Sequence, residues 1–515
     1  MSHTRRDFIK FVVVGSIASG CPIDNALRAE AAPNDPSPLV EGDHFAVCHQ
    51  VRDGHSFAKP EATRTAEVVI IGGGMAGLSA AYFLREKDWL LLEKEDHFGG
   101  NAYEEEYHSQ FFSTAAAYDF RGSFSDQLAK EIGVDMPLVD MPDPTIDNRT
   151  YVPDTWRSGL EHLPYKKEVV ASFKKFRDDI MKIDVRAKML ELDTKPFSEI
   201  TSAYAPEVGK WWDAYGPSNW GAVTEDTTAF IGVFDAQYLI KGEDNTRCIL
   251  PGGLGCISYK LVEVLKPKDA DRMISGATVV SVAQDGDAVR VTYLLGDKLT
   301  TVSAKLVLMC TPKFITSRLV AGLSTDQQQA MRRMRYAPFP MINMIFDKPV
   351  YRRGYDNWCP GNSFTDFIVA DWTVRNNPGY HPKYNILTFY TPLRESERAI
   401  LLQEDDCKAL AAKVLKDFQK ALPEFNVDPI EIRLYRRGHP MMMAVPGQFT
   451  TNRMIASKPM ERIFFANSDS GGPESLSTEA VRISRAAAEW ANLVLAGKSG
   501  AASELAHKAL TAVVL

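Results

Sequence analysis

The chain has 515 residues, more than one ordinary domain contains, and 45% of them are hydrophobic, which is enough to form sizeable cores. Its formal net charge of −7 comes without a basic stripe, so we expect no nucleic-acid partner. Seven cysteines in a chain of this length exclude a small scaffold held together by disulfides. These features leave a large globular protein of more than one domain.

The first 31 residues have the features of an export signal. Arg5 and Arg6 precede an apolar run that is too short to span a bilayer, and this arrangement resembles a twin-arginine signal. An A-x-A pattern at Ala29–Ala31 offers a cleavage site, so we expect a signal peptide at 1–31 and a periplasmic protein. Alternatively, the segment that ends at Cys21 resembles a degenerate lipobox, which would attach a lipid there. The signal peptide or that lipid is the expected membrane contact.

Residues 32–65 are rich in Pro, Asp and Gly, and we expect them to form an extended N-terminal arm. Within this arm, Cys48 and His49 form the second half of a C-x-x-C-H haem-attachment motif, with Phe45 at the position of the first cysteine. Imidazole is a common axial ligand, so a haem held through Cys48 and His49 is one interpretation. The alternative is that His49 is hydrogen-bonded to the surface of the adjacent domain.

The rest of the chain is organised around a glycine-rich turn. Residues 68–71 form a β-branched run typical of a strand buried in a parallel sheet, and an apolar helical stretch follows the turn. Gly72 suits the tight turn, Gly74 lets the backbone approach a diphosphate, and Gly77 lets the helix pack on the strand. The N-terminus of that helix favours negative charge. The residues expected to bind the diphosphate are Gly72, Gly74, Met75, Ala76 and Gly77.

A carboxylate is present where a dinucleotide-binding fold requires one. The apolar run 89–92 ends in Glu93, which lies 21 residues after Gly72 (93 − 72) and can accept hydrogen bonds from an adenosine ribose. Strand, glycine turn, helix, second strand and acid occur in the required order. We therefore prefer a dinucleotide site to a purely structural glycine turn.

The segment after Glu93 resembles the E-x-x-x-x-x-G-G motif of the flavin-dependent amine oxidase superfamily. This resemblance implies FAD rather than NAD, bound close to Gly99 and Gly100 with Lys94 nearby. In that family an arginine usually follows the two glycines. Here the residue is Asn101, which removes one phosphate-pairing charge.

The resemblance continues into the C-terminal half of the chain. It implies that the backbone at Val280 lies along the adenine, and that a small-residue loop containing Asp469 lies at the isoalloxazine. A helix that starts at Thr478 and Glu479 would then point its N-terminus at the flavin. These four residues complete the set that we expect to contact FAD.

The resemblance also implies the fold class: α/β, with a Rossmann-like FAD-binding domain that carries an inserted α+β substrate domain, as in amine oxidases. The FAD-binding domain is expected to be discontinuous. The expected ranges are 66–119, 246–312 and 429–497 for the FAD-binding domain, 120–245 and 313–428 for the substrate domain, and 498–515 for a C-terminal tail.

Candidate substrate-side residues are fewer. Residues 211–220 combine aromatic and polar side chains, which suits the wall of a channel for an ammonium group paired with Asp213; ordinary core packing is the preferred alternative. His439 is a candidate base, haem ligand or hydrogen-bonded structural histidine. Two residues depart from the family pattern. Leu476 replaces an aromatic residue of the usual amine cage, and Met341 replaces a lysine that holds a water at the flavin, which puts oxidation by O2 in doubt.

These features predict an FAD-dependent amine dehydrogenase that transfers a hydride from the amine carbon of a polyamine-type substrate to the flavin. The pattern H-x-x-R-D-G at 49–54 resembles the N-terminal segment of bacterial spermidine dehydrogenases, exported flavoproteins of this superfamily, some of which carry haem. Electrons would leave through a haem or a periplasmic acceptor. A desaturase-like flavoprotein and a non-catalytic flavin or haem electron-transfer protein are the alternatives.

Overall fold

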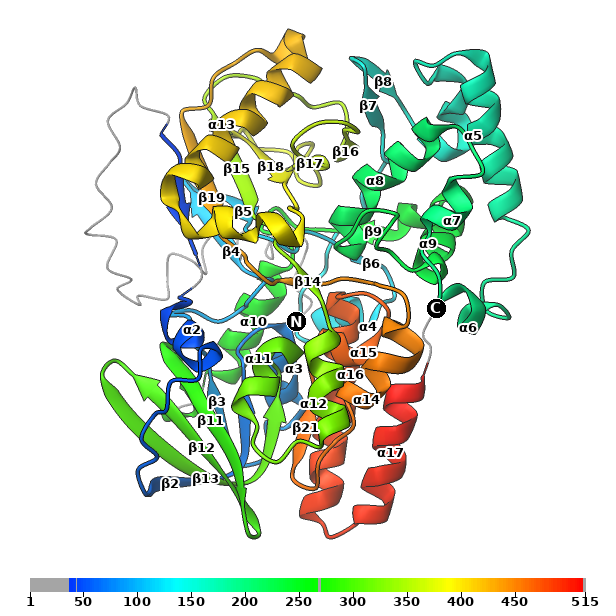
Figure 1. Cartoon of the computed structure of the whole chain (residues 1–515). Helices are drawn as coiled ribbons and strands as arrows, with labels where there is room; N and C mark the ends of the chain where they lie inside the picture. Colours follow the sequence, from blue (N-terminus) through cyan, green and yellow to red (C-terminus); the bar gives the residue numbers. More distant parts are fainter. Residues whose placement is uncertain (1–36, 43, 267–269, 513–515) are drawn as a thin grey trace.

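The structure is a computed structural model that describes residues 37–42, 44–266 and 270–512 (Figure 1). The expected export signal, its cleavage site and Cys21 lie outside these residues. Figure 1 shows one sheet above another, each covered by helices, with a mainly helical region beside the upper sheet. None of the helices in the described part of the chain is both long enough and apolar enough to cross a membrane.

The lower sheet has seven strands, in the order β10-β3-β2-β13-β12-β11 with β21 paired to β13. Strands β10, β3, β2, β13 and β21 run parallel, whereas β11, β12 and β13 form an antiparallel meander. The run 68–71 is buried in β2, as expected for a strand covered on both faces. The strands are β2 (Ala62–Ile71), β3 (Trp89–Leu92), β10 (Met273–Ile274), β11 (Ala277–Asp285), β12 (Ala288–Leu295), β13 (Lys298–Met309) and β21 (Ile463–Phe465).

Helices cover both faces of the lower sheet. On one face α3, α4, α10, α16 and α17 share a hydrophobic core with β2, and on the other face α11, α12 and α14 pack on the meander. The helices are α3 (Met75–Phe83), α4 (Phe124–Glu131), α10 (Gly255–Leu265), α11 (Lys313–Leu319), α12 (Thr325–Arg333), α14 (Arg453–Ala456), α15 (Ser468–Gly471), α16 (Ser477–Leu495) and α17 (Ser499–Thr511).

Several expected boundaries of the lower domain differ from the observed ones. Residues 124–136 and 313–334, which we expected in the substrate domain, contribute to the cores on the two faces of the lower sheet. Residues 499–511 form α17 rather than a loose tail, because Ala502 and Ala506 are buried against the rest of this domain. An amphipathic helix shows which face it buries, but not which of two cores receives that face.

The upper sheet has eight strands in the order β1-β19-β15-β18-β17-β16-β7-β8, and α13 packs on it. Strand β19 belongs to this sheet, so the expected boundary at 428 is wrong. The strands and helix are β1 (Leu39–Glu41), β7 (Thr145–Asp147), β8 (Thr150–Val152), β15 (Met341–Phe346), β16 (Asp356–Trp358), β17 (Asp366–Val369), β18 (Asn385–Tyr390), β19 (Glu431–Tyr435) and α13 (Glu404–Ala421).

The N-terminal arm is not extended throughout, contrary to expectation. Strand β1 pairs in parallel with β19 of the upper sheet, and helix α2 (Ala46–Arg52) packs against α11 and β11 of the lower domain. The arm therefore contacts both domains.

The helical region beside the upper sheet has a core dominated by aromatic rings. Its helices are α5 (Lys167–Ile180), α6 (Met189–Leu192), α7 (Ser198–Thr201), α8 (Pro206–Trp220) and α9 (Ala229–Lys241). Short ladders elsewhere pair β4 (Glu104–Tyr107) with β5 (Gln110–Ser113), β6 (Asp119–Phe120) with β9 (Arg247–Cys248), and β14 (Tyr336–Ala337) with β20 (Met441–Met442). Short 3-10 or π segments are η2 (Thr155–Gly159), η3 (Leu160–His162), η4 (Glu243–Thr246), η5 (Ala270–Arg272), η6 (Glu395–Leu402), η7 (Pro423–Phe425) and η8 (Gln448–Asn452).

Removal of residues 498–515 is expected to destabilise the lower domain. The Arg482 Nη1 and Arg453 Nη2 atoms donate to the Ala509 and Leu510 carbonyl oxygens, at 2.9 and 3.0 Å, and truncation leaves both buried cations without these acceptors. Two such hydrogen bonds correspond to a loss of about 3 kcal/mol or more in the free energy of unfolding. Thermal melting of the holoprotein checks this, with Glu504→Gln on the exposed face of α17 as a control that should leave the Tm unchanged. An unchanged Tm in the truncated protein would contradict the prediction.

Candidate active site

The glycine turn leaves no room for side chains at two of the three glycines of its G-x-G-x-x-G motif. Gly72 has a φ of +103°, and a Cβ on it would lie 2.8 Å from the Cys310 carbonyl oxygen. A Cβ on Gly77 would lie 1.8 Å from the Gly72 oxygen, so α3 could not pack against β2. Gly74 differs, because its φ is −75° and a Cβ there would meet no protein atom closer than 3.7 Å. A requirement for glycine at Gly74 must therefore come from a ligand.

The positive end of α3 lies beside a second pair of glycines. Gly74 is the N-cap of α3 and forms an isolated parallel bridge with Gly99. Gly99 and Gly100 both have positive φ, and a Cβ on Gly100 would approach the Gly74 Cα to 3.0 Å. Met75 and Ala76 occupy the first two positions of the helix. Backbone N–H groups and the helix dipole thus form a cradle that fits a diphosphate.

Glu93 is held at the end of β3 by the glycine turn itself. Its Oε2 atom accepts a hydrogen bond from Gly73 N at 2.6 Å, and its Oε1 atom accepts one from Glu95 N at 2.8 Å. Burial raises the pKa of Glu93, and these two N–H groups oppose that shift. Each carboxylate oxygen keeps a second lone pair, so Glu93 can still accept hydrogen bonds from ribose hydroxyl groups. The neighbouring Lys94 forms an ion pair with Glu95.

An arginine from a distant segment approaches Asn101, where the family motif usually has its own arginine. Asn101 Nδ2 donates to the Pro440 carbonyl oxygen at 3.0 Å, and Arg437 Nη1 donates to Asn101 Oδ1 at 3.5 Å. Arg437 Nη2 also donates to Thr114 Oγ1 at 2.8 Å. Sequence spacing gives no hint of this guanidinium group, because 336 positions separate it from Asn101.

A fully buried lysine binds Asp469. Lys313 follows β13, and its Nζ donates to Asp469 Oδ1 and Ser470 Oγ, both at 2.5 Å. Tyr336 Oη and the Lys313 backbone N donate to Asp469 Oδ2, at 2.6 and 2.9 Å. Burial lowers the pKa of Lys313, and Asp469 opposes that shift. Both Asp469 oxygens therefore have protein partners, and its contact with FAD stays a prediction.

The remaining residues expected at FAD lie inside β11 and at the start of α16, both in the lower domain. Val280 occupies a bulge in β11, where the register against β12 shifts. Thr478 Oγ1 accepts a hydrogen bond from the first backbone N–H of α4 at 3.0 Å. Glu479 is buried in the first turn of α16 and accepts a hydrogen bond from Arg482 Nε at 2.9 Å. Because α16 packs along α3, Thr478 and Glu479 belong to the wall beside the cradle.

The aromatic segment 211–220 lies on α8 and is mainly core. Trp212 and Trp220 are completely buried among other aromatic rings, in line with the preferred alternative. Trp211 and Tyr215, about one turn apart on the same face, also line two adjoining hollows between α8 and α9. Part of the segment therefore borders an internal pocket as well as the core.

Asp213 lies apart from the pocket side of α8, and its role in substrate binding stays a prediction. Its side chain is exposed, and its Oδ1 atom accepts hydrogen bonds from the backbone N and the Oγ1 of Thr224, both at 2.8 Å. Successive helical residues point about 100° apart, so a residue two positions after Trp211 leaves α8 on the opposite face. Asp213 stabilises the turn that follows α8.

Three further residues considered for the active side, His439, Met341 and Leu476, lie between strands or at the start of a strand or a helix. His439 is half-buried between β19 and β20, and its ring stacks on Phe314 with 4.4 Å between ring centroids. Met341 is fully buried at the start of β15, and Leu476 is the N-cap of α16. Neither Met341 nor Leu476 supplies an ammonium group or an aromatic ring at its position.

A pair of buried carboxyl groups joins the substrate side to the lower domain. Asp235 of α9 and Glu474, in the loop before α16, are hydrogen-bonded to each other. Asp235 Oδ2 also accepts hydrogen bonds from Trp220 Nε1 at 2.5 Å and from Tyr215 Oη at 3.5 Å. Burial raises the pKa of Asp235 to about 6 and that of Glu474 well above its usual value.

Adjacent carboxylates in a dry site repel each other, so this pair retains a proton that an exposed pair would lose. Sequence spacing does not reveal the pair, because Asp235 and Glu474 are 239 positions apart (474 − 235).

The arm residues considered for a haem lie on α2. Cys48 and His49 are half-buried, and the His49 ring lies 4.9 Å from the Phe45 ring between centroids. No three His, Cys, Asp or Glu side chains converge as metal ligands in the residues that the structure describes. A haem iron takes only one or two axial ligands from the protein, so this absence does not bear on Cys48 and His49, and the haem stays a prediction.

Comparison with known proteins gives this arrangement a context. A family model described as flavin containing amine oxidoreductase matches residues 75–490. The oxidoreductase PigB of Serratia sp. (strain ATCC 39006) is 21% identical, over 79% of this chain and 72% of that protein.

Similar solved structures include two amine oxidases. A putrescine oxidase bound to putrescine has a TM-score of 0.66 at 15% identity, over 84% of this chain and 99% of that one. Cyclohexylamine oxidase from Brevibacterium oxydans IH-35A has a TM-score of 0.65 at 16% identity, over 84% of this chain and 100% of that one. The expected fold class, a Rossmann-like FAD-binding domain with an inserted α+β domain, is confirmed.

Gly74→Ala is expected to prevent binding of the dinucleotide while the fold remains intact. The added methyl group meets no protein atom closer than 3.7 Å, but it occupies the approach to the helix N-terminus. Gly77→Ala is the contrasting variant, because its Cβ would collide with the Gly72 oxygen and should lower the Tm of the apoprotein itself. FAD released on denaturation and melting followed by circular dichroism separate the two effects. A full complement of FAD in Gly74→Ala would rule out this position as the diphosphate site.

Proposed function

This chain belongs to the flavin-containing amine oxidoreductase family, and on that premise we propose that it is an exported FAD-dependent amine dehydrogenase with a polyamine-type substrate. The family implies a flavin, and the cradle around Gly74 with Glu93 fits its diphosphate and ribose. The names of the structural neighbours, putrescine oxidase and cyclohexylamine oxidase, support an amine as substrate. The twin-arginine pattern in residues 1–31 supports export in the folded state.

The observation that carries the proposal is the buried carboxyl pair of Asp235 and Glu474. Asp235 comes from α9 in the helical region, and Glu474 from the loop that leads into α16, which packs along α3 of the cradle. An amine arrives as an ammonium ion and must lose a proton before its α-carbon can give up a hydride. A carboxyl pair that already shares one proton can accept the proton of the ammonium ion, and the pair then carries no charge.

The protein's own groups set up this proton transfer. Trp220 and Tyr215 hold Asp235 in place, and the aromatic core around them excludes water, which favours the neutral amine over the ammonium ion. When bound, the flavin supplies the acceptor for the hydride, and water hydrolyses the imine that leaves the site. Asp235 and Glu474 hold the proton taken from the ammonium group until it passes to solvent.

The proposal includes an electron acceptor other than O2, in the periplasm. Met341 supports this part, because it provides no ammonium group that could hold a water for oxygen chemistry. A haem at Cys48 and His49 is one form that such an acceptor could take.

Anaerobic mixing of the holoprotein with a panel of monoamines and polyamines is expected to bleach the flavin absorbance. Air is then expected to restore the absorbance slowly, and an artificial electron acceptor quickly. Reduction by an alcohol or an alkene, with no response to any amine, would replace the proposal with the desaturase-like alternative. Absence of reduction by every compound would favour an electron-transfer protein.

The rate of flavin reduction at saturating amine is expected to rise with pH through about 6. Burial raises the pKa of Asp235 to about that value, so below it both carboxyl groups hold protons and neither can accept another. Above it the pair has lost one proton and can act as a base. Asp235→Asn and Glu474→Gln should each lower the rate and flatten this rise. Rapid-mixing kinetics across pH check this, and a lower Tm with an unchanged pH profile would indicate a purely structural pair.

A further inference from the structure

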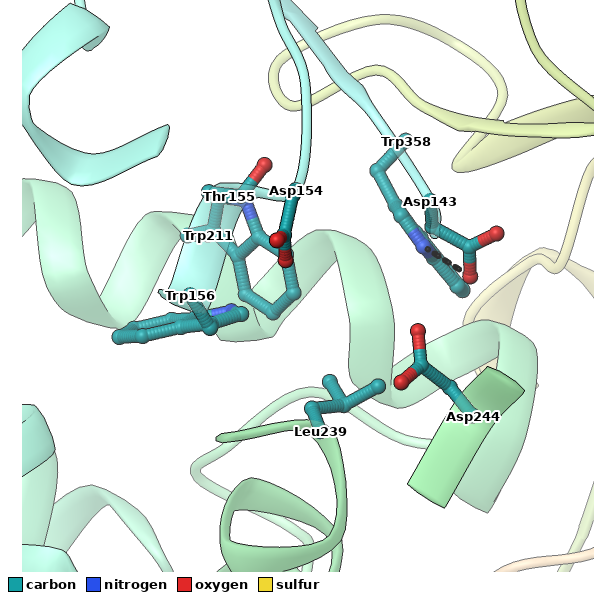
Figure 2. Close-up of a pocket in the computed structure, with 8 residues that line it drawn as sticks. All are labelled: Asp143, Asp154, Thr155, Trp156, Trp211, Leu239, Asp244 and Trp358. Atoms are coloured by element: carbon teal, nitrogen blue, oxygen red, sulfur yellow. Dashed lines mark hydrogen bonds between the residues drawn. The ribbon is translucent and has the colours of Figure 1, made fainter. Parts of the chain in front are cut away.

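A small pocket lined by aromatic and acidic side chains lies in the helical region (Figure 2). It is enclosed by η2, α8, α9 and β16, and its volume of about 20 Å³ is enough for one water-sized group. Trp156, Trp211 and Trp358 form its aromatic walls, and its acids include the half-buried Asp143 and the buried Asp244.

Three carboxyl groups line this pocket, those of Asp143, Asp154 and Asp244, whereas two guanidinium groups lie beside them. Arg157 forms an ion pair with Asp154. Arg247 forms an ion pair with Asp143 and also donates from Nη1 to Asp356 Oδ2 at 3.2 Å, so two carboxyl groups share one guanidinium. Asp244 is only 6% exposed, and its Oδ1 atom has no hydrogen-bond partner among the described residues. Figure 2 shows the Asp244 carboxylate pointing toward Asp143 across the pocket.

A bound cation would stabilise the charged forms of both Asp143 and Asp244. Burial raises the pKa of Asp143 to about 6 and also raises the pKa of Asp244, because neither carboxylate is adequately solvated. A buried oxygen without a donor costs free energy, and a positively charged donor removes that cost most effectively.

We propose that this pocket binds a primary ammonium group. The three N–H donors of such a group suit the unpaired Asp244 oxygen and Asp143, and the indole faces attract its charge. A metal ion fits less well, because no three ligand side chains converge in the described ranges. A quaternary ammonium group is too large for the volume.

The pocket lies close to the carboxyl pair. Leu239, which lines it, follows Asp235 by four residues and thus lies about one turn further along α9. Tyr215 contacts Asp235 through its Oη and lines an adjoining hollow together with Asp143 and Asp244. Tyr215 thus lies between the two sites, and a short aliphatic diamine that spans it would present one nitrogen to the carboxyl pair and the other to the pocket. The identification of this second ammonium with the substrate rests on the proposed function, whereas the pocket's affinity for an ammonium group does not.

The test compares putrescine with butylamine, which lacks the second nitrogen, in anaerobic flavin reduction by the holoprotein. The wild type is expected to bind putrescine about 10- to 100-fold more tightly than butylamine, the range for a hydrogen bond to a charged group. Asp244→Asn should abolish most of this preference. Asp178→Asn, which removes an exposed carboxylate on α5, should retain it. Equal affinities in the wild type, or an unchanged preference in Asp244→Asn, would overturn the proposal.

A second measurement separates the pocket from the reaction. Asparagine matches aspartate in size, and the affected oxygen has no hydrogen-bond partner, so Asp244→Asn should fold with an undiminished Tm. Calorimetric titration with putrescine should then give binding to the wild type that is at least about 10-fold weaker in the variant. If no amine reduces the flavin, the proposed function fails while this titration still decides the pocket. Equal binding by both proteins, or no binding by the wild type, refutes it.

Discussion

The buried ammonium group of Lys313 determines how three separated segments of the chain meet. Its partner Asp469 belongs to α15, and Tyr336 of β14 donates to the same carboxylate. Loss of either charged partner at this depth would leave the other uncompensated, at a cost of several kcal/mol. The end of β13, the β14 ladder and the loop after β21 are therefore restricted to arrangements that keep the pair intact.

The position of this ion pair follows from the parallel strands of the lower sheet. Gly72 follows β2, Glu93 follows β3, and Lys313 comes shortly after β13, so all three lie at the carboxyl edge, where open α/β sheets bind ligands. The glycine cradle and the Lys313 pair thus share one edge. Helix α16 closes the cradle from the side, because it packs along α3.

The substrate side has a different kind of buried charge. Asp235 and Glu474 satisfy each other through a shared proton, whereas Asp244 keeps an oxygen without a partner in the described residues. The Asp235–Glu474 pair and Asp244 both lie at α9, and Tyr215 of α8 lies between them. The aromatic core thus serves two purposes: it stabilises the helical region, and it provides the dry surroundings in which these carboxyl groups have raised pKa values.

Local sequence determined the cofactor cradle, because its elements depend on backbone conformation and short-range order. Gly72, Gly74, Gly77 and Glu93 can be recognised from their spacing, since a tight turn between a strand and a helix has few solutions. The same holds for the buried run in β2. The aromatic residues of 211–220 are also evident in the sequence, but only the structure shows that they lie on a helix, which places Asp213 on the face opposite Trp211 and Tyr215.

Only the tertiary structure decided which distant groups meet. Asp235 and Glu474, Arg437 and Asn101, and Lys313 and Asp469 come together through domain packing, for which sequence spacing carries no signal. The same limit explains the shifted domain boundaries, since α4, α11, α12 and α17 have apolar faces that either core could bury. Backbone geometry is a local property and can be read from the chain, but the pairing of buried charges depends on which surfaces exclude water together.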